Sequence, residues 1–221
     1  MSLDVTLAIA SAIIGYIAGS LSFGYWIAKA RGVDIFAVGS RNPGATNVKR
    51  SVGSKAGNLV FILDFVKGLL ATGWPLLLHG NSESGYVYGL IGLFAAVLGH
   101  SFSIFTGFRG GKGVATMLGG VAALMPLAAL IGAAVWLILF YATRYVSVAS
   151  IALALSLPIT NWLSGQPSAL LWVSVALAIV VIYRHKSNII RLVKGQENRF
   201  ERKKSASESS EQSETTIEET K

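Results

Sequence analysis

Residues 114–141 read VATMLGGVAALMPLAALIGAAVWLILFY, an apolar run of 28 residues with Pro126 near its middle. As one helix the run would be about 42 Å long, whereas the hydrocarbon core of a bilayer is roughly 30 Å thick. Proline kinks or ends a helix because it lacks an N–H and its ring meets the preceding turn. The run therefore predicts either one overlong helix or two short helices that separate near Pro126.

Five further apolar stretches approach the roughly 20 residues that a membrane-spanning helix needs. They cover residues 5–28, 56–78, 86–105, 146–163 and 169–183. The whole chain of 221 residues is 52% hydrophobic and 14% charged, with a mean hydropathy of +0.57. This composition is more apolar than that of soluble domains and indicates an all-α membrane protein.

The positions of the basic residues decide between the two interpretations of residues 114–141. Of the 19 Lys and Arg residues, only Lys67 lies inside an apolar stretch. Two short helices keep the other eighteen on one side of the membrane, as the positive-inside rule requires. We therefore expect about seven transmembrane helices, two of them short, with the N-terminus outside and the C-terminus cytoplasmic. The net charge of +8 is explained in the same way, without a nucleic-acid partner.

The chain changes character after the last apolar stretch. Residues 184–204 are basic, and residues 205–221 are rich in Ser, Thr and Glu without aromatic residues. Such a composition does not bury enough apolar surface to fold. We expect one membrane domain over residues 1–198 and a basic, then acidic, disordered cytoplasmic tail over residues 199–221.

Several kinds of chemistry are excluded or disfavoured by composition. The chain has no cysteine, which excludes thiolate catalysis and disulfides. Its three histidines, His79, His100 and His185, are widely spaced and form no HExxH pair. We expect no metal site and no cofactor.

The connection over residues 29–55 contains Gly39-Ser-Arg-Asn-Pro-Gly-Ala-Thr-Asn47. Glycine turns let backbone N–H groups converge on an anion, and hydroxyl, amide and guanidinium groups add donors. The alternative is a solvated connector of ordinary turn residues. The candidate substrate-binding residues are Ser40, Asn42, Gly44, Thr46 and Asn47, with Arg50 as a candidate catalytic residue.

A second glycine-rich segment, Phe108-Arg-Gly-Gly-Lys-Gly-Val-Ala-Thr116, opens directly onto residues 114–141. The free N–H groups and the positive dipole end of a following helix favour a bound phosphate. The segment is not a Walker A loop, because Gly113 follows Lys112 where Ser or Thr is required. The alternative is a flexible turn with a snorkelling lysine. The candidates here are Gly110, Gly111 and Gly113 for binding and Lys112 for catalysis.

Three further polar pairs stand three residues apart and therefore share a helical face. Asp64 and Lys67 are costly in lipid unless paired, which favours a structural ion pair over a chemical role. Ser147 and Ser150 begin an apolar stretch, where small hydroxyls serve either packing or substrate binding. His185 and Asn188 follow the last stretch. His100 stands just before the second glycine-rich segment and is expected to orient it.

Together these motifs resemble the bacterial acyl-phosphate:glycerol-3-phosphate acyltransferase family. The first family signature is similar to Gly19-Ser20 with residues 39–47 and Arg50, and the second to Gly99-His100 with residues 110–116. The third is similar to residues 147–150 with His185, Asn188 and Glu197. Ser22, Arg41, Ser103 and Ala149 depart from the family pattern, which commonly has Pro, Gly, Pro and Ser at these positions.

The resemblance implies an enzyme of the bacterial inner membrane with its active site on the cytoplasmic face. Such an enzyme transfers a fatty acyl group from acyl phosphate to the 1-hydroxyl of glycerol 3-phosphate, and it forms lysophosphatidate in phospholipid synthesis. Acyl phosphate, glycerol 3-phosphate and membrane lipid are then its partners, with other enzymes of phospholipid synthesis as candidates.

Two phosphorylated substrates require two anion-binding regions. We expect Ser40, Thr46 and Asn47 to hold one phosphate, and the polar residues of the other segments to hold the second. Those residues are Arg50, Lys112, Ser150, His185 and Asn188.

No Ser-His-Asp triad is apparent, so the donor phosphate itself is the expected proton acceptor, with His185 as the alternative base. The competing functions are an organic-phosphate transporter, which favours midplane sites and repeated halves, and a CDP-alcohol phosphotransferase, whose Asp-rich motif is missing.

Overall fold

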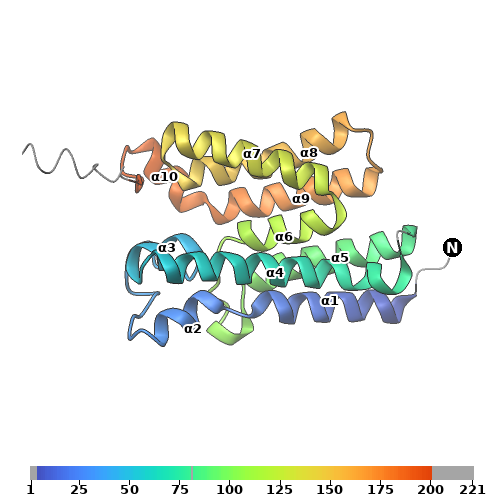
Figure 1. Ribbon diagram of the computed structural model, residues 1–221, viewed down its shortest axis with the longest axis horizontal. Helices are drawn as coiled ribbons and strands as arrows, with labels where there is room; N and C mark the ends of the chain where they lie inside the picture. Colours follow the sequence, from blue (N-terminus) through green and yellow to red (C-terminus); the bar gives the residue numbers. More distant parts are fainter. Residues whose placement is uncertain (1–3, 81, 201–221) are drawn as a thin grey trace, which may run out of the picture.

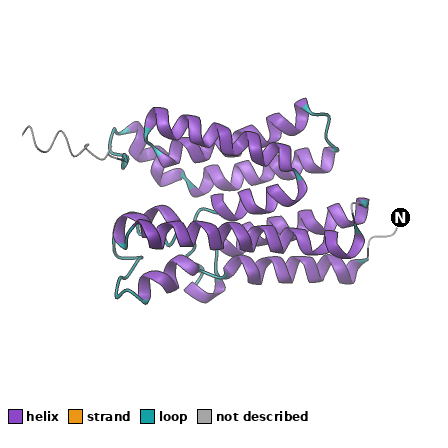
Figure 2. Ribbon diagram, in the orientation of Figure 1, coloured by secondary structure: helices purple, strands orange, loops and turns teal. Residues whose placement is uncertain are grey.

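The computed structural model describes residues 4–80 and 82–200, and all regular structure in that part of the chain is helical (Figure 2). The helices follow one another in the order α1 Val5–Ser20, α2 Phe23–Lys29, α3 Ala45–Ser51, α4 Ser54–His79, α5 Glu83–Ser101, η1 Ile104–Thr106, α6 Val114–Leu124, α7 Pro126–Thr143, α8 Val146–Leu163, α9 Ser168–Arg184 and α10 Lys186–Val193. Residues 201–221, most of the expected tail, lie outside the described residues.

The expected break near Pro126 is present. Helix α6 ends at Leu124, and α7 begins with Pro126. Proline is tolerated at the first position of a helix because an N–H group there has no carbonyl acceptor within the helix. The expectation of two short helices is wrong for α7, which runs for 18 residues to Thr143, whereas α6 has only 11. At 1.5 Å per residue, α6 is about 16 Å long and too short to cross a bilayer alone.

The chain is therefore a multi-pass membrane protein with five to six candidate spans, compared with the expected seven of which two were short. Five spans are long and apolar enough by themselves, and α9 with α10 makes a sixth if this pair, bent by 58°, is one span. Many large apolar side chains on these helices are exposed, among them Ile13, Leu77, Ile138 and Trp172. Apolar faces of this kind are stable in contact with lipid, whereas their exposure to water costs free energy.

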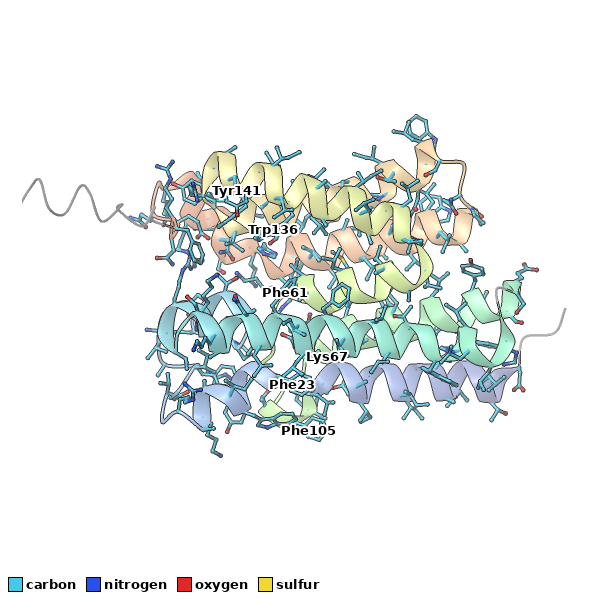
Figure 3. The ribbon with its side chains drawn as sticks, in the orientation of Figure 1. Phe23, Phe61, Lys67, Phe105, Trp136 and Tyr141 are labelled. Carbon is cyan, nitrogen blue, oxygen red and sulfur yellow. The ribbon has the colours of Figure 1, made fainter. Side chains whose placement is uncertain are left out.

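The first apolar stretch is broken, which sequence analysis did not predict. Helix α1 ends at Ser20 and α2 begins at Phe23, so carbonyl groups at the break lose their helical donors. Two side chains replace those donors. Lys67 Nζ donates to the Leu21 carbonyl at 2.7 Å, and Ser103 Oγ donates to the Ser20 carbonyl at 2.6 Å. Figure 3 shows Lys67 on α4 close to Phe23 at this break.

The helices form two layers with α6 between them (Figure 1). One layer contains α1, α4 and α5, and the other contains α7, α8 and α9. Helix α1 approaches α5 so closely that a Cβ on Gly19 would overlap the Ala96 carbonyl oxygen, and a Cβ on Gly68 of α4 would overlap that of Thr116 in α6. A shared core that includes Leu93, Met117 and Leu177 joins the two layers.

Helices α2, α3 and α10 lie at one end of the molecule, whereas α1 begins at the other end (Figure 1). The polar segments before α3 and α6 are therefore brought to the same end as the start of α8 and the end of α9.

Candidate active site

A cavity of about 130 Å³ lies between the two layers at the end of the molecule that carries α3 and α10. Its wall brings together residues from all the polar segments of the sequence. The predicted site residues on its wall are Ser40, Asn42, Gly44, Thr46, Asn47, Arg50, Asp64, His100, Lys112, Ser147, Ser150, His185, Asn188 and Glu197. Gly110, Gly111, Gly113 and Lys67 are not part of this wall.

The loop before α3 is organised by the side chain of Asn47. Its Oδ1 accepts a hydrogen bond from the backbone N–H of Ser40 at 2.9 Å, and its Nδ2 donates to the carbonyls of Ile35 and Val38 at 3.3 and 3.1 Å. Asn47 is 1% exposed. The hydrogen bonds of the Asn47 side-chain amide therefore fix the conformation of the loop and hold Ser40 at the cavity.

Asn42 connects the two glycine-rich segments. Its Oδ1 accepts from the Gly44 N–H at 2.8 Å, and its Nδ2 donates to the Gly110 carbonyl at 3.4 Å. The neighbouring Arg41 has a left-handed φ of +52°, a conformation in which glycine has no steric cost. This geometry gives a physical reason for the glycine common at this position in the family that the sequence resembles.

The second glycine-rich segment packs directly on His100. A Cβ on Gly111 would overlap His100 Nε2, and the Gly111 N–H donates to the His100 carbonyl at 2.9 Å. Arg184 holds the other side of the segment, donating to the carbonyls of Gly110 and Gly111 at 2.9–3.1 Å. Gly113 has φ +80° and precedes the first turn of α6. These glycines permit close backbone packing that fixes where Lys112 emerges.

Lys112 belongs to a chain of hydrogen bonds centred on Glu197. Lys112 Nζ donates to Asn188 Oδ1 at 2.5 Å, and Asn188 Nδ2 donates to Glu197 Oε1 at 2.6 Å. Ser147 Oγ also donates to Oε1, at 2.9 Å, and Arg191 Nε donates to Oε2 at 2.8 Å. An ammonium group has three N–H donors, so Lys112 keeps two beyond the one that Asn188 accepts.

The protonation states of Lys112 and Glu197 are set by burial and by the neighbouring charges and hydrogen bonds. Burial lowers the pKa of Lys112 to about 8, opposed by the negative charge of Glu197. Burial acts to raise the pKa of Glu197, but hydrogen bonds from Asn188, Ser147 and Arg191 hold it below its ordinary value. At neutral pH the site therefore contains an ionised carboxylate and a lysine that is mostly protonated.

His185 and Ser150 face the same cavity with defined hydrogen bonds. His185 Nδ1 lies 2.8 Å from the Val181 carbonyl, so Nδ1 carries the proton and Nε2 is an acceptor. Burial and the charge of Lys112 lower the pKa of His185 to about 4, which keeps the ring neutral. Ser150 Oγ accepts from Trp136 Nε1 at 3.2 Å, which leaves its own O–H available as a donor.

Arg50 lies on the same wall and contacts the segment after α10. Its Nη2 donates to the Asn198 carbonyl at 3.1 Å, and its guanidinium lies over the Phe200 ring at 4.5 Å.

At the cavity wall, Asp64 of α4 is the centre of a buried polar cluster that joins α4, α5 and α6. Lys67 Nζ lies 2.8 Å from Asp64 Oδ1, and His100 Nδ1 lies 3.6 Å from the same oxygen. His100 Nδ1 is also 3.2 Å from Thr116 Oγ1. All four side chains are buried. The arrangement links the break after α1 to the support of the glycine-rich segment.

Two aromatic side chains line the cavity together with its polar groups. Phe61 on α4 and Trp136 on α7 both contribute to its wall, and Figure 3 shows them on the two sides of the space between the layers. Cationic and hydroxyl groups combined with aromatic groups suit a molecule with an anionic head and an apolar tail. Among the described residues, no group of three or more His, Cys, Asp or Glu side chains is placed to hold a metal ion.

Comparison with known proteins gives this arrangement a family. The profile of the family described as "Glycerol-3-phosphate acyltransferase" matches residues 9–195. The glycerol-3-phosphate acyltransferase of Aquifex aeolicus is 46% identical over 190 residues, covering 85% of this chain and 96% of the relative. The chain belongs to the glycerol-3-phosphate acyltransferase family. The enzyme of that name from Fusobacterium nucleatum is 44% identical over 192 residues, covering 85% of this chain and 95% of the relative.

Two solved structures of the acyltransferase family share the fold. A crystal structure of PlsY, an integral membrane glycerol 3-phosphate acyltransferase in its glycerol 3-phosphate form, superposes with a TM-score of 0.83 at 44% identity. It covers 88% of this chain and 96% of that protein. The lysophosphatidic acid form superposes with a TM-score of 0.79, covering 88% of this chain and 95% of that protein. The resemblance seen in the sequence is therefore confirmed.

Four site residues of this acyltransferase family member were missed by sequence analysis, namely Phe61, Trp136, Arg184 and Arg191. Arg191 follows His185 and Asn188 at the same spacing of three, a helical-face signal that could have identified it. Arg184 and Trp136 carried no comparable signal. Arg184 resembles an ordinary positive-inside residue, and Trp136 resembles a lipid-facing aromatic, until the fold brings them to Gly111 and Ser150.

Proposed function

We propose that this chain transfers a fatty acyl group from acyl phosphate to the 1-hydroxyl of glycerol 3-phosphate, forming lysophosphatidate. Family membership supports the acceptor and the product. The observation that carries the proposal is that one cavity is lined by Lys112, Arg50 and Arg191 together with Phe61 and Trp136. The site can thus hold phosphate groups beside aromatic side chains.

Both substrates carry a phosphate, and the cavity offers donors in two regions. The loop before α3 supplies Ser40 and the first turn of α3 supplies Thr46, with Asn47 and Asn42 holding the shape of the loop. The other region contains Lys112, Arg50, Ser150, His185 and Asn188. The donors of the two regions hold the two anions side by side and offset the repulsion between them. This arrangement places the acceptor hydroxyl near the acyl carbon. We propose that charge stabilisation and positioning supply the larger part of the catalysis.

In the chemical step, the 1-hydroxyl oxygen attacks the acyl carbonyl carbon. The bond from that carbon to the phosphate oxygen breaks, and inorganic phosphate leaves. The hydroxyl proton passes to an oxygen of the departing phosphate. A phosphate leaving group makes a covalent acyl-enzyme unnecessary.

His185 is the alternative proton acceptor, and its environment argues for a positioning role. A base with a pKa of about 4 is poorly matched to proton abstraction near neutral pH. Its Nε2 can still accept a hydrogen bond from a substrate hydroxyl. The variant His185→Gln separates these roles, because a glutamine amide can accept a hydrogen bond but cannot take a proton.

We further propose that residues 1–198 form one acyltransferase domain in the bacterial inner membrane, with the active site on the cytoplasmic face. The C-terminal end is then cytoplasmic and the N-terminal end external. The basic residues near the site support this orientation by the positive-inside rule. Because the chain has no cysteine, single cysteines introduced at Ser84 and Lys194 would report the sidedness by labelling of intact cells.

The proposal is tested by following labelled glycerol 3-phosphate into lysophosphatidate with palmitoyl phosphate as donor. The wild-type protein should form product, Lys112→Ala should lose at least a hundredfold in kcat/KM, and Lys55→Ala, an exposed cation away from the cavity, should match wild type. Absence of product from folded wild-type protein would favour the transporter function, to be tested by flux in vesicles.

A further inference from the structure

A second, more open cavity of about 380 Å³ adjoins the active site. Six cationic residues line it, and no Asp or Glu of the described residues does. They are Arg41, Arg109, Lys112, Arg184, Lys186 and Arg191. We refer to this cavity as the basic antechamber.

The antechamber and the active-site cavity share part of their walls. Ser40, Asn42, Lys112 and Arg191 line both. Lys112, the cation that donates to Asn188 in the active site, therefore stands at the boundary between them. An anion in the antechamber has a continuous path of donors into the active site.

Arg109 and Lys186 line the basic antechamber but not the active-site cavity. Both are held in place without acidic partners. The Arg109 guanidinium lies 4.1 Å from the centre of the Phe36 ring, and Lys186 Nζ lies 5.1 Å from that of Tyr183. Among the described residues, no carboxylate lies within 4.0 Å of Arg109 or Lys186. Their positive charge is thus uncompensated and available to a mobile anion.

We infer that the basic antechamber is the route by which small phosphate dianions travel between water and the active site. The inference rests on the proposed function, which requires a soluble phosphorylated acceptor to meet a lipid donor. Phe61 and Trp136 in the active-site cavity suit the acyl chain of the lipid donor, whereas the basic antechamber suits a soluble dianion. The shared chemistry is a phosphate dianion, either incoming glycerol 3-phosphate or departing inorganic phosphate.

The test replaces two antechamber cations that lie outside the active-site wall, in the double variant Arg109→Gln/Lys186→Gln. The matched control is Lys55→Gln/Lys194→Gln, which removes two exposed charges that line neither cavity. For a dianion passing about 10 Å from each charge, kcat/KM for glycerol 3-phosphate should fall about eightfold at about 10 mM ionic strength and about twofold at about 150 mM. The kcat and the kcat/KM for acyl phosphate should stay at wild-type values.

A kcat/KM for glycerol 3-phosphate that equals wild type at both ionic strengths would overturn the inference. So would an equal loss in the control variant, which would indicate general surface charge. A loss confined to nanodiscs of anionic lipid would also overturn it, by assigning these cations to lipid headgroups. Inhibition by inorganic phosphate, measured in Arg109→Gln/Lys186→Gln, separates the two sources. If this inhibition weakens in parallel with kcat/KM for glycerol 3-phosphate, the two dianions share the route. If the inhibition is unchanged, the route serves the acceptor alone.

The proposed function and this inference fail in different ways. If the wild-type protein forms no lysophosphatidate, the proposed function fails and binding of labelled glycerol 3-phosphate decides the inference. Weaker binding in Arg109→Gln/Lys186→Gln than in Lys55→Gln/Lys194→Gln would support the antechamber, and equal binding would overturn it.

Discussion

The lowered pKa of Lys112 predicts that the activity of this protein falls at alkaline pH. Burial brings that pKa to about 8, so the ammonium charge is present below this value and is lost above it. If the protonated form is the one that holds a substrate phosphate, kcat/KM follows its fraction. From pH 7 to pH 9 that fraction falls about tenfold, with a limiting slope of −1 in a logarithmic plot.

The assay is the initial rate of lysophosphatidate formation from labelled glycerol 3-phosphate at subsaturating concentration, between about pH 6.5 and pH 9.5. The second ionisation of a phosphate monoester lies near pH 6, so the acceptor is a dianion over the alkaline limb. Parallel samples without enzyme correct for hydrolysis of the acyl phosphate. Bound phosphate stabilises the charged lysine, so the fall in kcat should occur at higher pH than the fall in kcat/KM.

Lys112→Arg provides the matched variant. A guanidinium stays protonated over the whole range, so this variant should have a lower maximum but no decline centred near pH 8. A wild-type kcat/KM that is flat to pH 9 would refute the reasoning. The same decline in Lys112→Arg would also refute it, because the titrating group would then be another one.

Three further predictions test other parts of the site. Glu197→Gln removes the charge that raises the pKa of Lys112, so the alkaline decline in kcat/KM should move to lower pH, and an unmoved decline would contradict this coupling. Trp136→Phe keeps the aromatic wall but removes the hydrogen bond to Ser150; we expect a loss of about five- to tenfold in kcat/KM, and wild-type kinetics would exclude a role for that bond. Lys67→Met leaves Asp64 buried without its cation, so thermal unfolding in detergent should indicate a loss of about 3 kcal/mol; an unchanged Tm, or no partial recovery in Lys67→Met/Asp64→Asn, would contradict the ion pair's structural role.

Much of the fold followed from apolar periodicity and charge. The separation of α6 from α7 was predicted from the length of the run and from Pro126, and the basic residues gathered at the end of the molecule that carries the cavity. The break after Ser20 was not predicted, because Leu21 and Ser22 continue an apolar sequence. The acceptors at that break are satisfied by Lys67 and Ser103, and such long-range partners cannot be read from one segment.

The individual roles of site residues were harder to predict than the site itself. Composition alone could not separate an anion-binding Asn47 from one that shapes its own loop, because both use the same amide. Small residues such as Gly15 and Gly19 in a membrane helix can serve either internal packing or a dimer contact, and sequence does not distinguish the two. The structure packs both glycines on α5, since the approach of the helices is a tertiary property.

The central claim is that acyl phosphate is the donor, and product stoichiometry tests it most directly. Purified protein would be given glycerol 3-phosphate with palmitoyl phosphate or palmitoyl-CoA, and lysophosphatidate and inorganic phosphate would be measured together. We expect equal molar amounts of the two products from palmitoyl phosphate and no lysophosphatidate from palmitoyl-CoA. Lysophosphatidate formed from palmitoyl-CoA at a comparable rate, or formed without an equal release of phosphate, would contradict it.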